Sequence, residues 1–101
     1  MARIAVARYA DVPERIPHKV EVNGHPIVLC KLDGEVFALD DTCTHENESL
    51  SEGEIWDDVI ECPKHGAQFD IRTGAVASMP AVVPEQTYPV MIDADQVYLD
   101  L

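Results

Sequence analysis

Apolar residues recur with a two-residue period in the first half of the chain, and tight-turn signals separate the segments that carry them. Val20 and Val22 alternate with charged neighbours, as in a strand with one buried face. An Asn-Gly pair at 23–24 and an Asp-Gly pair at 33–34 supply the positive φ angles of type I′ turns between antiparallel strands. The pattern predicts a meander of three strands, over residues 18–22, 25–32 and 35–40.

Similar segments occur at the two ends of the chain. Residues 3–7 form a further candidate strand, and residues 87–93 and 96–101 flank an Ala-Asp corner that predicts a closing hairpin. Pro89 has no backbone N–H to donate, so we expect an edge or bulged position there. Helical signals are weak, and residues 11–15 allow one short turn at most. Short strands throughout predict an all-β fold, a small antiparallel β sandwich or barrel.

The segment between these regions contains two Cys-His pairs. Cys43 and His45 form the first pair, and Cys62 and His65 form the second. Thiolate and imidazole ligands suit zinc, iron, copper or an iron-sulfur cluster, so the residue types alone leave the metal open. A closed structural zinc site without redox chemistry, in an interaction domain, is the plainest alternative to a redox centre.

The residues between the two pairs predict a small hairpin. Residues 54–56 and 59–61 have strand character and flank an Asp-Asp turn. Each Cys-His pair then lies in a loop at one end of this hairpin, and Pro63 and Gly66 suit sharp backbone turns near a ligand. Two loops held by one hairpin can converge on a single inorganic centre.

Length, composition and charge narrow the classes of function. The 101 residues suit one domain, and the hydrophobic fraction of 47% is that of a soluble protein with no apolar run long enough to span a membrane. The net charge of -12 repels phosphate backbones and anionic lipid and attracts basic protein surfaces, which argues against nucleic acid and membrane as partners. Charged residues interrupt the N-terminal apolar runs, so we expect a cytoplasmic protein with its three cysteines reduced.

The spacing of the pairs resembles that of the Rieske family. The chain has CTH, then sixteen residues, then CPKH, and the similarity continues through CPKHGAQFD and RTGA. The resemblance implies one [2Fe-2S] cluster per chain, with Cys43 and Cys62 on one iron and with His45 and His65 as the exposed ligands of the other. It also implies a single Rieske domain over residues 1–101, in which a cluster-binding subdomain of two loops, about residues 42–72, is inserted into the β fold.

Departures from one branch of that family indicate the type of centre. Family members of the quinol-oxidising complexes have an additional Cys in each loop, where this chain has Glu48 and Lys64. They also have Ser and Tyr hydroxyls near the cluster, where this chain has Ala67 and Phe69. Hydrogen bonds to sulfur stabilise the reduced cluster, so their absence lowers the reduction potential. We therefore expect a low-potential centre.

The resemblance extends to the ferredoxin components of ring-hydroxylating dioxygenase systems. Their role implies a monomeric electron carrier without catalytic residues, which takes single electrons from a flavin-dependent reductase to a terminal oxygenase. We expect transient electrostatic docking, with the acidic residues near the pairs attracting basic partner surfaces. The small Rieske-like subunit of a nitrite reductase and a redox-sensing interaction module remain as alternatives. The acidic residues in question are Glu46, Glu48, Glu52 and Glu54.

A few further residues carry structural expectations. We expect Cys30 to be a small buried hydrophobe, and His18 and His25 to be solvated. We expect Trp56 to support the core of the hairpin between the two pairs, with contact to a partner protein as the alternative. Residues 78–81 contain a proline and match the place of a family loop that shields one side of the cluster.

Overall fold

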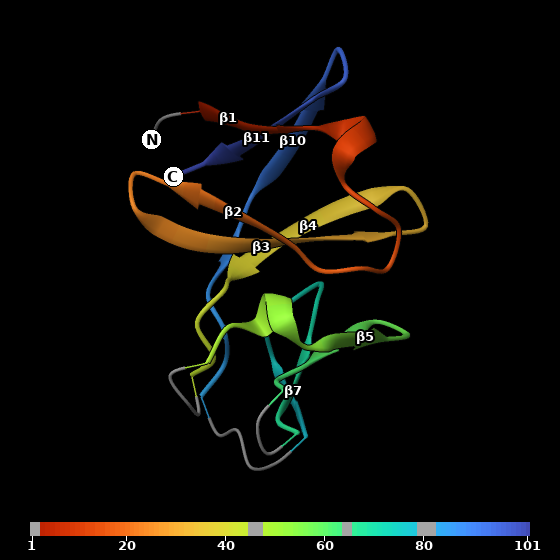
Figure 1. Ribbon diagram of the computed structural model, residues 1–101, viewed down its shortest axis with the longest axis vertical. Helices are drawn as coiled ribbons and strands as arrows, with labels where there is room; N and C mark the ends of the chain where they lie inside the picture. The colour runs from red at the N-terminus through yellow and green to blue at the C-terminus, as the bar shows by residue number, and fades with distance from the viewer. Residues whose placement is uncertain (1–2, 45–47, 64–65, 79–82) are drawn as a thin grey trace.

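The computed structural model describes residues 3–44, 48–63, 66–78 and 83–101. Within these ranges the strands form three antiparallel sheets, with the orders β1-β11-β10, β2-β3-β4-β9 and β5-β6-β7-β8. The first two sheets form a part that we call the base, and the third sheet with its flanking loops forms a part that we call the tip (Figure 1). The all-β, antiparallel fold predicted from the sequence is confirmed.

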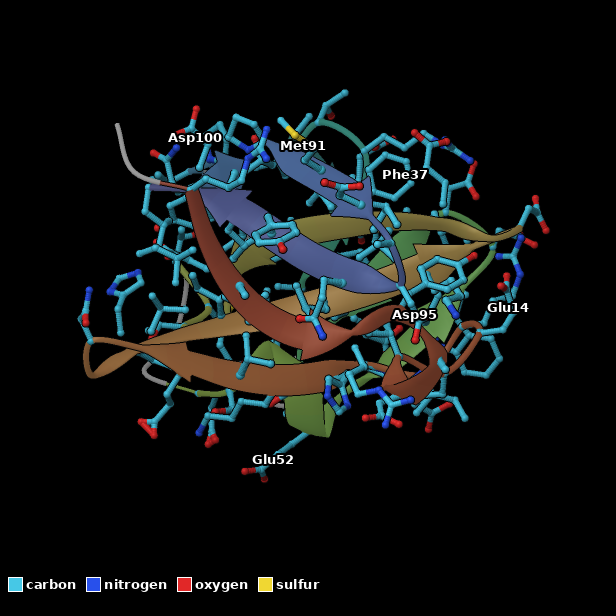
Figure 2. The ribbon with its side chains drawn as sticks, turned by 90° about the horizontal axis from the view of Figure 1, so that it is seen from above. Glu14, Phe37, Glu52, Met91, Asp95 and Asp100 are labelled. Atoms are coloured by element: carbon cyan, nitrogen blue, oxygen red, sulfur yellow. The ribbon has the colours of Figure 1, made fainter. Side chains whose placement is uncertain are left out.

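Most strands of the base follow the predicted pattern. Asn23 and Gly24 have φ angles of 53° and 80°, and Asp33 and Gly34 have 52° and 87°, as type I′ turns require. Figure 2 looks down on the base, where the β1-β11-β10 sheet lies over the meander, with Asp95 and Asp100 at opposite ends of β11. The base strands are β1 (Arg3–Arg8), β2 (His18–Val22), β3 (His25–Leu32), β4 (Glu35–Asp40), β9 (Thr87–Tyr88), β10 (Val90–Asp93) and β11 (Gln96–Asp100).

The predicted strand over residues 87–93 is divided at Pro89. Before the proline, Tyr88 of β9 pairs with Ala38 of β4. After it, Met91 of β10 pairs with Tyr98 of β11 in the other sheet. Proline cannot donate to a ladder, so the chain leaves one sheet and enters the other at this point. The crossing links the two sheets of the base.

The tip contains the predicted hairpin and two strands that were not predicted. β5 (Glu54–Trp56) pairs with β6 (Val59–Glu61). β7 (Gln68–Asp70) and β8 (Val76–Ser78) extend this sheet. Two 3-10 turns, η1 (Tyr9–Asp11) and η2 (Leu50–Glu52), are the helical segments of the described chain, and η1 begins before the short turn expected at residues 11–15.

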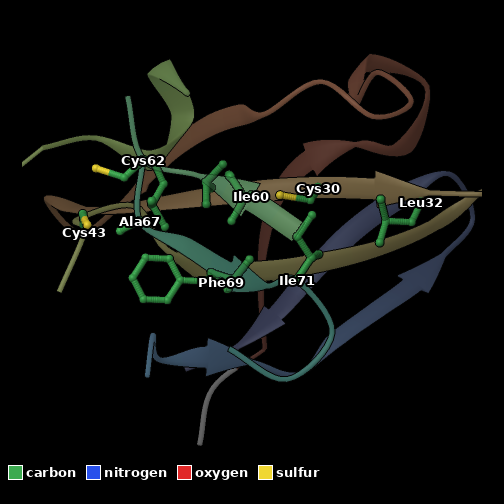
Figure 3. Packing of buried hydrophobic residues seen from close by; sticks show 11 residues of the cluster. Cys30, Leu32, Cys43, Ile60, Cys62, Ala67, Phe69 and Ile71 are labelled. Atoms are coloured by element: carbon green, nitrogen blue, oxygen red, sulfur yellow. The ribbon is translucent and has the colours of Figure 1, made fainter. Parts of the chain in front are cut away.

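β3 separates two hydrophobic cores because successive side chains of a strand point to opposite faces. Ile27 and Leu29 pack with residues of the β1-β11-β10 sheet in the base. Cys30 and Leu32 pack with residues of the tip, among them Phe69 (Figure 3). All of these side chains are buried, which confirms the expectation for Cys30. The tip therefore rests directly on the apolar face of the meander.

The helical segments of the described chain are single 3-10 turns. None of them has the length or the apolar content needed to cross a lipid bilayer.

Candidate metal centre

The two segments that contain the Cys-His pairs are closed by matching backbone hydrogen bonds. The N–H of Cys43 donates to the carbonyl of Glu48 at 2.8 Å, and the N–H of Cys62 donates to the carbonyl of Ala67 at 2.7 Å. Each cysteine therefore begins a short loop that returns to its own backbone. His45 and His65 belong to these loops by sequence, and both lie outside the described residues.

The thiols of the two pairs lie in one place. Cys43 and Cys62 are 3% and 1% exposed, and both belong to the core beneath the tip. Figure 3 shows them at the same end of that core, with Cys30 farther along it. Burial, with a smaller contribution from Asp41, raises the pKa of Cys30 to about 12, so Cys30 remains a protonated thiol. The structure therefore distinguishes the paired cysteines from the third one.

Apolar side chains form the core to which the two cysteines belong. Leu50, Ala67 and Phe69 are fully buried members of it. Ala67 follows Gly66, whose φ of 73° favours glycine and turns the second loop back toward β7. Neither Ala67 nor Phe69 has a hydroxyl group that can donate to a nearby sulfur, so the wall that they form is apolar.

A buried carboxylate holds the start of the first loop. Asp41 is 1% exposed, and its Oδ1 accepts from the N–H of Ser51 at 2.8 Å while its Oδ2 accepts from Oγ of Ser49 at 2.6 Å. The N–H of Leu50 also donates to the backbone carbonyl of Asp41 at 2.6 Å. These bonds fix the two ends of the first loop against each other. Sequence reasoning missed this residue.

A second buried carboxylate contacts the first loop from the other side. Oε2 of Glu85 accepts from the N–H of Thr44 at 2.8 Å, and Oγ1 of Thr44 donates to the carbonyl of Val83 at 2.6 Å. Burial raises the pKa of Glu85 to about 7; the bond from Thr44 acts in the opposite direction, and the charges of Asp40 and Asp41 raise the pKa further. Sequence reasoning missed Glu85 as well, because nothing local marks it as buried.

The expectation for Trp56 needs correction, and the expectation that His25 is solvated is confirmed. Trp56 is 53% exposed and does not support the core; Ile55 on the opposite face of β5 packs there instead. His25 is exposed, as expected, while His18 is partly buried. The Nε2 atom of His25 lies 2.6 Å from Oδ1 of Asp40, which also accepts a hydrogen bond from the hydroxyl of Tyr88 at 2.6 Å.

The acidic residues near the pairs have different surroundings. Glu52 and Glu54 are exposed, and Glu48 is partly buried, while Glu46 lies outside the described residues. Lys64 and most of the loop at 78–81 lie outside them too, and Ser78 ends β8. The exposed acidic charge of the described tip thus includes two of the four glutamates expected to attract a partner.

Comparison with known proteins places these features in a family. The family described as the Rieske [2Fe-2S] domain matches residues 2–89. The ferredoxin component of biphenyl 2,3-dioxygenase from Rhodococcus jostii (strain RHA1) is 45% identical over 101 residues, covering 100% of this chain and 94% of that protein.

Solved structures agree with the sequence comparisons. A ferredoxin of Sphingomonas yanoikuyae B1 is 37% identical, with a TM-score of 0.94 over 99% of both chains. A ferredoxin solved in a complex with the reduced oxygenase of carbazole 1,9a-dioxygenase is 36% identical, with a TM-score of 0.90 over 96% of this chain and 100% of that one.

Proposed function

The chain belongs to the Rieske [2Fe-2S] domain family, and we propose that it passes single electrons from a flavin-dependent reductase to the terminal oxygenase of a ring-hydroxylating dioxygenase system. It carries one [2Fe-2S] cluster, and its role is electron transfer rather than catalysis. The observation that carries the proposal is the full-length similarity to a dioxygenase ferredoxin component, at 45% identity. The zinc alternative is set aside by the same family match.

The proposed ligands are the four residues of the two pairs. Cys43 and Cys62 would hold one iron, and His45 and His65 would hold the other, within a cluster-binding subdomain of about residues 42–72 in a single domain. The described thiols fit this assignment because both are buried at one end of the same core, in loops closed by matching backbone bonds. When bound, the cluster supplies the reversible uptake of one electron.

The residues around the site bear on the reduction potential. Leu50, Ala67 and Phe69 exclude water from the side of the site that faces the core. Ala67 and Phe69 offer no hydroxyl donor to sulfur, so nothing at these positions stabilises the additional negative charge of the reduced state. We therefore propose a potential near the lower end of the family range of roughly -150 to +300 mV.

Partner exchange would be electrostatic and transient. Glu52 and Glu54 are exposed on the tip, and the chain has a net charge of -12, which favours encounter with basic surfaces. The ferredoxin of the carbazole 1,9a-dioxygenase structure is seen bound to its oxygenase. By analogy we propose that this chain docks on a terminal oxygenase as a cytoplasmic monomer.

Two measurements test the proposal in sequence. Electron paramagnetic resonance on the dithionite-reduced protein should give a rhombic signal with an average g near about 1.9, and a metal assay should give about two irons per chain. The protein is then supplied with the reductase and the oxygenase of the Rhodococcus biphenyl dioxygenase system in place of their own ferredoxin. Turnover that depends on this chain supports the proposal. The proposal would be refuted if the chain held an intact cluster, yet the reductase could not reduce it and the oxygenase could not oxidise it.

A further inference from the structure

A buried carboxylate, for which the described residues supply no basic partner, lies beside the first loop. Glu85 is 4% exposed, and no lysine or arginine of the described residues forms an ion pair with it. Asp40 and Asp41, which carry the same sign, raise its pKa, and they themselves contact Lys19, at 4.0 Å from Oδ2 of Asp41, and His25, at 2.6 Å from Oδ1 of Asp40. Burial of a carboxylate in an acidic neighbourhood opposes folding. A buried acid of this kind in a functional region indicates a role beyond stability.

The backbone around Glu85 is held by two other segments. Its N–H donates to the carbonyl of Gly74 at 2.8 Å. The carbonyl of the next residue, Gln86, accepts from the N–H of Asp40 at 2.9 Å. Gly74 has a φ of 79°, and a Cβ atom there would lie 2.3 Å from the carbonyl oxygen of Glu85. Only glycine permits this approach. The carboxylate is therefore presented from a fixed backbone.

The atom that this carboxylate contacts belongs to the peptide between two proposed ligands. Thr44 stands between Cys43 and His45, and its N–H donates to Oε2 of Glu85. The hydroxyl of Thr44 donates to Val83, so the first loop and residues 83–85 are joined by two bonds. When it is ionised, Glu85 thus carries a negative charge one hydrogen bond away from the backbone between the proposed ligands Cys43 and His45.

We infer that Glu85 is a positioning residue for the redox centre, which fixes the Thr44 peptide and whose charge keeps the reduction potential of the cluster low. The inference rests on the ligand set of the proposed function. Reduction adds one negative charge to the cluster, and a fixed negative charge in a poorly solvated site opposes that addition. The apolar wall of Ala67 and Phe69 and the charge of Glu85 then act in the same direction.

The test is the midpoint potential of E85Q, measured at pH 8.5. The glutamine keeps the oxygen acceptor and the size of the side chain but removes the charge. With a pKa of about 7, Glu85 is ionised in the parent protein at this pH. We expect a higher midpoint potential, with an unchanged iron content and an unchanged rhombic signal. Glu54→Gln, which removes an exposed charge from β5, is the matched control and should leave the midpoint unchanged because water screens it.

Two further variants separate charge from position. Glu85→Asp keeps the charge but withdraws it from Thr44, so the rhombic signal should change while the midpoint potential does not rise. Thr44→Val removes the bond to Val83 and leaves Glu85 in place, so the midpoint should stay at the parent value. A rise in Thr44→Val as large as that in E85Q would show that loop anchoring, and not the charge, sets the potential, which overturns the inference.

A merely structural role gives a different result. In that case E85Q and Glu85→Asp would melt at lower temperature but keep the parent midpoint potential and resonance spectrum, and the inference would fail while the electron-transfer function stood. If E85Q does not load iron, Glu85→Asp decides, because a parent spectrum in that variant would exclude positioning by Glu85. A parent protein that holds no [2Fe-2S] cluster would refute the proposed function itself.

Discussion

The base and the tip are both antiparallel β structures, yet they are stabilised by different kinds of contact. In the base, β3 has eight residues and buries side chains on both of its faces. In the tip, each of the strands β5 to β8 has three residues. Strands of that length bury little apolar area by themselves. The comparison indicates that the tip relies on the meander for its core and on polar contacts for the placement of its loops.

The two loops of the tip differ in the same way. The second loop closes the β6–β7 hairpin, and the bond from Cys62 to Ala67 continues the ladder that pairs Glu61 with Gln68. The first loop has no such ladder; a single bridge joins Thr42 to Ser49. Both buried carboxylates of the described residues contact this first loop. Where strand pairing is limited to one bridge, buried acids supply further hydrogen bonds that place the loop.

Loss of one proposed ligand should give the largest difference between the two regions, because it should remove the cluster from the tip and leave the strands of the base intact. Serine is a far weaker iron ligand than a thiolate, so Cys62→Ser should reduce the iron content from about two per chain to almost none and abolish the rhombic signal. The strand signal of the base in circular dichroism should remain. Cys30→Ala is the matched control, since it removes a buried thiol of the same core that is not a proposed ligand, and it should keep both irons. Equal iron loss in both variants would contradict the ligand assignment.

A cavity in the base should lower the stability of the fold and leave the redox centre unchanged. Leu29 is fully buried in the core between the two base sheets. Leu29→Ala should lower the free energy of unfolding by about 2–5 kcal/mol, because it removes buried methyl groups and leaves a cavity. The midpoint potential of the folded protein should not change. Thermal unfolding and voltammetry on the same sample check both expectations, and a shifted midpoint would show that the base influences the redox centre.

The pH dependence of stability should report the polar contacts of the tip. The pKa of Glu85 is raised to about 7 from an ordinary value of 4.5, so the folded state holds its proton more tightly than the unfolded state. The stabilisation is complete below about pH 4.5 and is lost as the pH rises through 7, by at most about 3 kcal/mol. E85Q should lack this component. The apparent melting temperatures of the two proteins between pH 5 and 8.5 measure it, and parallel curves would contradict the prediction.

The same contrast explains which features the sequence could predict. The meander follows from local signals, because the alternation lies within the strands and the Asn-Gly and Asp-Gly turns lie directly between them. The strands β5 to β8 have three residues each, too few for a visible period; the hairpin of β5 and β6 was predicted from the Asp-Asp turn between two short segments of strand character, and β7 and β8 were missed. The bond from Thr44 to Glu85 spans 41 residues, and no local pattern marks one buried acid in an acidic chain. Trp56 was expected to support the core, whereas the face of β5 that packs inward carries Ile55.

The candidate site was predicted only as far as its motif extends. Cys43 and Cys62 were identified from their spacing, and the structure places both in the core of the tip. Asp41 lies just before the first pair, yet its role depends on Ser49 and Ser51 on the far side of the loop. Residues that support a site through contacts across a loop or between sheets leave no spacing that a sequence can reveal.

The smallest expected difference between the tip and the base concerns their surface charges. It should affect the rate of reduction by a partner, and only at low salt. Glu54 is exposed on the tip, and Glu21 is an exposed glutamate on β2 of the base. Glu54→Gln should slow reduction by a basic partner, on the order of twofold at low ionic strength, because it weakens long-range attraction. The effect should vanish near 1 M salt, where the screening length is about 3 Å. Glu21→Gln is the matched control and should leave the rate unchanged. Stopped-flow reduction of both variants measures the difference, and equal slowing would mean that total charge, rather than an acidic face on the tip, governs the encounter.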